Sequence, residues 1–114
     1  RRGQAGEDRA AEYFSEQGWA VLERNLRTRF DEIDLVAVRD TTVAFVEVKS
    51  WRTMPFADLE HAIGPRKRQR IKRSARRYLS EHPELSGFFV RFDVLFMQGD
   101  EMRPIHIEAA FDDE

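Results

Sequence analysis

The spacing of apolar residues changes along the chain between a helical period and a strand-like period. Two segments carry apolar residues three and four positions apart, which predicts helices over residues 3–17 and 65–81. Glu7 falls on the inward face of the first helix, together with small and aromatic residues. Gly18 is suited to ending the first helix and Pro65 to starting the second.

Five shorter segments are rich in β-branched and aromatic residues, as strands are. They cover residues 19–25, 32–38, 42–49, 88–97 and 105–109. The third is apolar almost throughout, which is typical of a central strand covered on both faces. The order α-β-β-β-α-β-β predicts one α/β domain over residues 1–114, with a central mixed β-sheet flanked by helices.

Acidic residues interrupt the two most apolar strands at one place. If Asp40 and Thr41 form the turn of a hairpin, Val36 faces Phe45 and Asp34 faces Glu47. Directly opposed residues have Cβ atoms roughly 5 Å apart. Two adjacent carboxylates in apolar surroundings need a compensating cation.

That cation can be supplied in two ways. Lys49 lies two residues beyond Glu47, about 6.6 Å along the strand. Oxygen ligands alone also suit Mg²⁺ or Mn²⁺, which would be held by Asp34 and Glu47. A metal there would activate water against a phosphate, Lys49 would assist that water or the transition state, and Glu7 would complete the shell. The alternative is a plain salt-bridge cluster that also includes Glu32.

Charge is unevenly distributed. The chain has a net charge of −2, yet residues 66–77 contain eight basic residues and no acidic one, so the remainder carries −10. Such asymmetry favours a polyanionic partner. Helical spacing aligns four arginines in one stripe that can follow a nucleic-acid backbone: Arg66, Arg70, Arg73 and Arg77. Lys67 falls on the inward face, where it needs a carboxylate or a substrate phosphate; the alternative is that its stem lies along the helix and its ammonium group reaches water. Trp51 and Arg52 could stack on a base or pack locally.

Several classes of protein are excluded by what the sequence lacks. It has no cysteine, and therefore no disulfide scaffold or thiolate zinc site. No apolar run is long enough to span a membrane, no signal-peptide pattern is visible, and we expect a cytoplasmic protein. The phosphate-loop, dinucleotide and serine-hydrolase motifs are also missing.

Six stretches together resemble a known pattern. They are G-x-x-G-E-x-x-A from Gly3, R-N at Arg24, E-I-D-L from Glu32, F-V-E-V-K from Phe45, K-x-x-R-I-x-x-x-A-x-x-Y-L from Lys67 and R-F-D-V from Arg91. The pattern is similar to the PD-(D/E)XK superfamily, which has the restriction-endonuclease-like fold and includes Holliday-junction resolvases. More closely, the chain resembles the YraN-type family of small uncharacterised bacterial proteins, regarded as endonucleases.

The resemblance implies a site made of Glu7, Asp34, Glu47 and Lys49, a Mg²⁺ cofactor and a DNA substrate. Junction-cutting relatives work as dimers, which makes a homodimer one expectation. Two positions depart from the family pattern: Asp31 replaces a glycine, and Trp51 replaces an arginine. Asp31 adds negative charge, which would alter substrate entry.

Three functions are therefore compared. The first is a Mg²⁺-dependent endonuclease acting on DNA. The second is a nucleic-acid-binding module of the same fold without catalysis, and the third is a protein-interaction domain that uses the basic helix.

Overall fold

The computed structural model of the chain describes residues 3–51 and 63–112. The elements, in chain order, are α1 (Gly3–Glu16), β1 (Ala20–Arg27), β2 (Glu32–Arg39), β3 (Thr42–Trp51), α2 (Pro65–Ser80), the 3₁₀ helix η2 (Pro83–Leu85), β4 (Phe89–Gln98) and β5 (Arg103–Phe111). The predicted order of helices and strands is confirmed. The predicted ends differ by up to two residues for most elements, and η2 occupies part of a predicted loop.

The five strands form one sheet in the order β1-β2-β3-β4-β5. β3 and β4 are parallel, and every other neighbouring pair is antiparallel, so the sheet is mixed as predicted. The parallel pair requires a long crossover, and α2 lies within it. The result is an α/β architecture compatible with a restriction-endonuclease-like fold.

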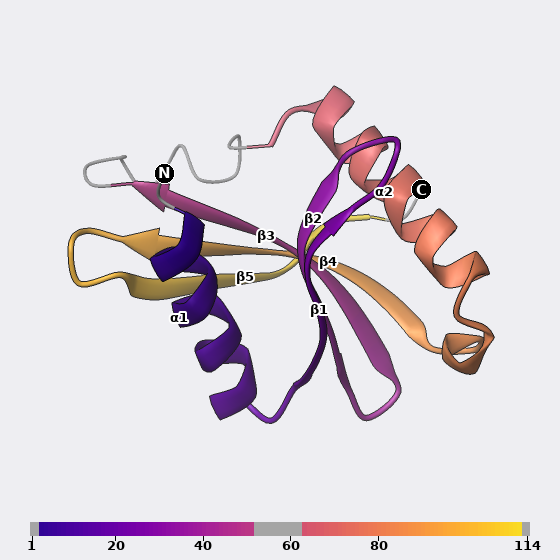
Figure 1. Cartoon of the computed structure of the whole chain (residues 1–114), viewed down its shortest axis with the longest axis horizontal. Coiled ribbons are helices and arrows are strands. Elements are labelled where there is room, and N and C mark those ends of the chain that lie inside the picture. The colour runs from indigo at the N-terminus through magenta and orange to yellow at the C-terminus, as the bar shows by residue number, and fades with distance from the viewer. Residues whose placement is uncertain (1–2, 52–62, 113–114) are drawn as a thin grey trace.

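The two helices cover opposite faces of the sheet (Figure 1). On one face, Ala10 and Phe14 of α1 pack with Leu35, Val46 and other residues of the inner strands. On the other face, α2 contributes residues to a larger core, which includes Ile71, Ala75, Tyr78, Val36, Phe45 and Phe92. β3 is therefore covered on both sides, as its continuous apolar run predicts.

The hairpin of β2 and β3 has the predicted register. Val38 pairs with Val43 and Val36 with Phe45, around a turn in which Asp40 has a φ of 54°. The paired positions end at Leu35 and Val46, one step before the predicted pair. The regular ladder thus stops where the acidic residues begin.

No helix among residues 3–51 and 63–112 is long and apolar enough to cross a membrane.

Candidate functional site

The ladder ends because a side chain takes over from the backbone. The Val48 N–H donates to Asp34 Oδ2 at 2.7 Å, so the carboxylate of β2 occupies the place of a strand carbonyl. Asp34 is thereby fixed against β3, next to Glu47. The prediction that these residues come together is supported by the electrostatic effect of Asp34 on Glu47, although they are not a regular cross-strand pair.

Glu47 is the unusual group of this cluster. It is only 7% exposed and lies on the α2 side of the sheet. Burial, and then the negative charge of Asp34, raise the pKa of Glu47 to about 7. Lys49 and Lys67 oppose that rise, with their Nζ atoms 3.6 Å and 3.8 Å from Glu47 Oε2. Two lysines therefore compensate this carboxylate only in part.

Asp31 also contacts Lys67, and residue spacing alone does not predict this contact. Lys67 Nζ lies 3.2 Å from Asp31, and Arg70 Nε lies 3.1 Å from Asp31 Oδ2. Burial acts to raise the pKa of Asp31, but hydrogen bonds from the Glu32 N–H and from the two basic side chains outweigh it and leave the pKa lowered. The predicted inward orientation of Lys67 toward carboxylates is confirmed.

Glu7 of α1 reaches the sheet through Asn25 of β1. Asn25 Nδ2 donates to Glu7 Oε1 at 2.9 Å. In the β1–β2 register, Arg24 pairs with Leu35 and Leu26 with Ile33, which places Asn25 beside Asp34. Glu7 is thus brought to the same end of the sheet as the carboxylate pair, from the opposite face to α2.

The turn between β1 and β2 is docked onto α2. Thr28 Oγ1 lies 2.6 Å from Ser74 Oγ, a residue that is fully buried in the middle of the helix. The ring centroid of Phe30 lies 5.4 Å from the guanidinium carbon of Arg29 and 6.0 Å from that of Arg73. The turn thereby adds arginines to the basic face of the helix, which sequence spacing within one helix cannot indicate.

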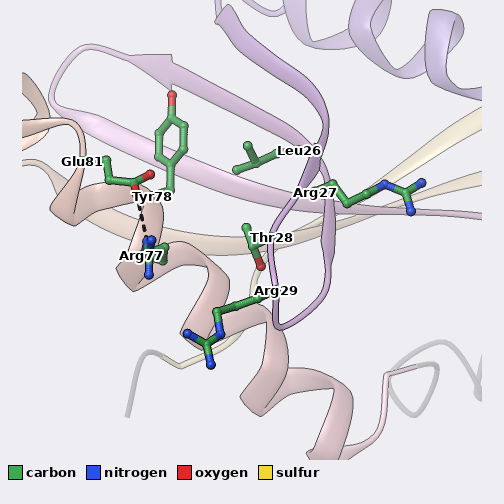
Figure 2. Close-up of a pocket in the computed structure, with 7 residues that line it drawn as sticks. All are labelled: Leu26, Arg27, Thr28, Arg29, Arg77, Tyr78 and Glu81. Atoms are coloured by element: carbon green, nitrogen blue, oxygen red, sulfur yellow. Dashed lines mark hydrogen bonds and ion pairs between the residues drawn. The ribbon is translucent and has the colours of Figure 1, made fainter.

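A shallow pocket of about 220 Å³ lies between this turn and the C-terminal half of α2 (Figure 2). Its polar walls carry Arg27, Arg29 and Arg77, and Tyr78 and Leu26 form its apolar part. Arg77 Nε donates to Glu81 at 2.8 Å, at the pocket rim. The pocket therefore combines cationic and apolar surface.

The four arginines of the predicted stripe are all exposed, but they differ in whether an acidic side chain contacts them. Arg66 and Arg73 lie on the surface. Arg70 is engaged by Asp31 and Arg77 by Glu81. Arg52 and the side chain of Trp51 lie outside the described residues.

A second polar cluster, missed in the sequence, is buried under α1. Asp93 is 1% exposed and accepts hydrogen bonds from Arg91, from the Ala109 N–H and from the His106 ring, whose Nε2 lies at 2.7 Å. Burial acts to raise the pKa of Asp93, and these bonds reverse the effect and lower it. Tyr13 Oη lies 3.1 Å from His106 Nδ1, so the cluster ties α1 to β4 and β5.

This cluster has a structural role. Every polar atom of the Asp93 carboxylate is bonded within the protein, and burial is the main cause of a raised pKa for Tyr13. Two signals in the sequence, an aspartate in an apolar strand and a histidine in the last strand, were too dispersed to predict the contact.

The family relationship follows from comparison with known proteins. The model of the uncharacterised protein family UPF0102 matches residues 6–97. The chain belongs to this family. A UPF0102 protein of Myxococcus xanthus is 41% identical over 112 residues, covering 96% of this chain and 88% of the relative. A UPF0102 protein of Rhodopseudomonas palustris is 42% identical, and the match covers 98% of this chain and 84% of the relative. A UPF0102 protein of Treponema pallidum is 36% identical, and the match covers 97% of this chain and 92% of the relative.

The UPF0102 match extends from α1 to the end of β4 and so contains the whole carboxylate and lysine cluster. Glu7, Asp34, Glu47 and Lys49 all lie inside it, as do the arginines of α2. The match covers 88%, 84% and 92% of these three relatives.

Proposed function

We propose that this UPF0102 protein is a metal-dependent nucleic-acid phosphodiesterase, an endonuclease acting on DNA, of the PD-(D/E)XK superfamily. One observation carries the proposal. A buried glutamate, Glu47, lies next to Asp34 and is contacted by Lys49 and Lys67, at the point where the β2–β3 ladder ends. Strongly perturbed carboxylates beside specific charge partners are typical of functional sites.

The donor set fits Mg²⁺ or Mn²⁺. Within residues 3–51 and 63–112, no three His, Cys, Asp or Glu side chains are grouped as a metal site. A metal would therefore depend on two carboxylates, Asp34 and Glu47, with water and substrate phosphate as further ligands. Mg²⁺ is commonly held in this way, and oxygen ligands select hard cations. The raised pKa of Glu47 also indicates unsatisfied demand for positive charge.

The roles of the residues follow from their positions. The metal, when bound, supplies Lewis-acid stabilisation of the phosphate and lowers the pKa of water. Asp34 and Glu47 hold it, and Glu7 orients the shell through Asn25. Lys49 presents an ammonium group beside Glu47, where it stabilises negative charge that develops on the phosphate. Lys67 is held between Asp31 and Glu47 and can exchange one of these anions for substrate phosphate.

The basic surface would hold the nucleic acid. It comprises the exposed arginines of α2, the last residue of β1 and an arginine of the β1–β2 turn: Arg66, Arg70, Arg73, Arg76, Arg77, Arg27 and Arg29. Guanidinium groups on a helix and an adjoining turn contact phosphates without reading sequence. Binding is therefore expected to be insensitive to base sequence and strongly weakened by salt.

The test is Mg²⁺-dependent cleavage of branched, double-stranded and single-stranded DNA by the wild type and by Asp34→Asn. The asparagine keeps an oxygen acceptor for the Val48 N–H but removes the charge, so folding should be retained. Asp40→Asn, in the exposed β2–β3 turn, is the matched control. Cleavage that persists in Asp34→Asn, or that occurs in a chelator, would contradict the proposal.

Binding of DNA is measured on the same samples. If the wild type binds DNA in a salt-dependent manner but no substrate is cleaved with Mg²⁺ or Mn²⁺, the second function, a non-catalytic binding module, replaces the first. The salt bridges of Asp31 favour that alternative, because they neutralise two basic residues next to Glu47.

A further inference from the structure

Asn25, whose register position in β1 is next to that of Asp34 in β2, carries an unsatisfied polar atom. Within the described residues, Asn25 Oδ1 is buried and has no hydrogen-bond partner, and it is the sole buried side-chain nitrogen or oxygen atom in that state. Leaving a buried acceptor unpaired is destabilising. Such an atom requires an explanation, which is commonly a missing water or ion.

The orientation of the amide is fixed by its neighbour. Asn25 Nδ2 donates to Glu7 Oε1 at 2.9 Å. An ionised carboxylate only accepts hydrogen bonds, so the NH₂ group must face Glu7 and the oxygen must face elsewhere. Exchanging the two amide atoms would place two acceptors against each other. The unpaired Oδ1 is therefore a consequence of the contact with Glu7.

The backbone at this position is unusual as well. Asn25 has a φ of 55°, in the left-handed region, although it lies within strand β1. Asparagine tolerates this conformation better than most residues. Strained backbone and an unpaired polar atom at one residue are characteristic of sites that bind something. The register places this residue beside Asp34.

The group that satisfies Oδ1 must be a hydrogen-bond donor or a cation. The side chains of Glu7 and Asp34 are carboxylates, and a carboxylate in its ionised form offers acceptors only. Mg²⁺ retains several of its waters when proteins bind it, and these waters are strong donors. Resting on the function proposed above, we propose that Asn25 is a positioning residue of the cation site, with Oδ1 accepting a hydrogen bond from a water of the hydrated divalent cation.

The alternative is an ordinary internal water that is present with or without the cation. The two differ in whether cation affinity depends on the amide. Groups that bond to metal ligands commonly change metal affinity about 10-fold to 100-fold when they are removed. An internal water unrelated to the cation would leave that affinity unchanged.

Asn25→Gly is the appropriate variant, because glycine adopts a positive φ without strain and removes only the amide. Asp40→Gly is its matched control, since Asp40 has a φ of 54° in the exposed β2–β3 turn. The Mn²⁺ dissociation constant is measured by calorimetry for both variants and for the wild type. We expect about 10-fold to 100-fold weaker binding for Asn25→Gly and no change for Asp40→Gly.

The wild type provides a second readout that needs no substitution. Asn25 is the only asparagine of the chain, so labelling with ¹⁵N-asparagine gives a single side-chain NH₂ signal. This signal should shift with Mg²⁺ at the midpoint found by calorimetry, and Mn²⁺ should broaden it beyond detection. When ¹⁵N-tryptophan is supplied as well, the indole N–H of Trp19, which is buried in the α1-side core, serves as the reference signal.

The outcomes separate the two proposals. Equal Mn²⁺ affinity in Asn25→Gly and in the wild type, or an Asn25 signal that does not respond to the cation, overturns the role of Asn25 and leaves the nuclease proposal intact. Failure of the wild type to bind Mg²⁺ or Mn²⁺, with or without DNA, removes the cation site and both proposals with it. If Asn25→Gly does not fold, the NMR titration of the wild type decides.

Discussion

Replacing Glu47 by glutamine is expected to make the protein more stable above pH 7, even though it alters the proposed catalytic site. Glutamine resembles the protonated glutamate in shape and charge. In the wild type, the ionised carboxylate is buried beside Asp34, and the two lysines compensate it only in part. The substitution removes a destabilising charge and retains most of the packing.

The magnitude follows from the pKa of Glu47, which rises from 4.5 to about 7 on folding. Between these values the folded protein keeps a proton that the unfolded chain has released. The stability of the wild type relative to the variant therefore falls as the pH rises from about 4.5 to about 7, and is constant above that window. The full effect corresponds to about 3 kcal/mol, of which 2–3 kcal/mol develops between pH 5 and pH 8.

The assay is urea unfolding of both proteins at pH 5, 6, 7 and 8 in the presence of a chelator. Comparing the two proteins at each pH cancels the titration of all other groups. Glu12→Gln, on the exposed side of α1, is the charge-matched control.

The reasoning would be refuted if the difference in free energy of unfolding between Glu47→Gln and the wild type stayed constant from pH 5 to pH 8. Mg²⁺ provides a second check. A cation held by Asp34 and Glu47 should stabilise the wild type at pH 8, because ligands that bind only the folded state add stability. The difference in free energy of unfolding between Glu47→Gln and the wild type should then become smaller.

Three further predictions concern other contacts. Asp93→Asn should destabilise the fold by about 3 kcal/mol in urea unfolding, since the His106 ring and the Arg91 guanidinium lose a buried anion. Because folding lowers the pKa of Asp93, the contribution of its carboxylate to the stability of the wild type is lost as the pH falls below about 4. Arg29→Ala should weaken DNA binding and reduce the salt dependence by about one phosphate contact, unlike Arg103→Ala in the β4–β5 hairpin. Asp31→Gly should tighten DNA binding about fivefold to tenfold, measured by fluorescence anisotropy, because it frees the side chains of Lys67 and Arg70. A DNA affinity equal to that of the wild type would contradict the prediction for Arg29→Ala or for Asp31→Gly.

Hydrophobic periodicity was sufficient to predict the architecture. The continuous apolar run of β3 indicated a strand covered on both faces, and helices on opposite sides of the sheet confirm it. The Asp40 turn fixed the hairpin register, because one apolar face on each strand permits a single alignment. Periodicity also placed Lys67 correctly toward the carboxylates.

The details of the site depend on contacts between segments distant in sequence, which periodicity does not report. The ladder stops at Leu35 because the Asp34 side chain captures the Val48 N–H, and a regular alternation cannot anticipate this. The positive φ of Asn25 likewise reflects its contact with α1 rather than its strand neighbours. Asp31 was noted as a departure from the family pattern, but its two salt bridges require α2 to lie across the turn.

These contacts share one physical feature. At the end of the sheet where backbone pairing ceases, the fold holds a carboxylate with a raised pKa, a strained strand residue and an unpaired amide oxygen. Each is unfavourable in the free protein, and a hydrated divalent cation would relieve the charge of Glu47 and satisfy Asn25 together. The buried Asp93 cluster shows the contrast, because there every carboxylate oxygen is already bonded within the protein. A charge cluster that only stabilised the fold would be expected to resemble Asp93. The raised pKa of Glu47 and the unpaired Asn25 Oδ1 differ from that pattern and support the proposed cation site.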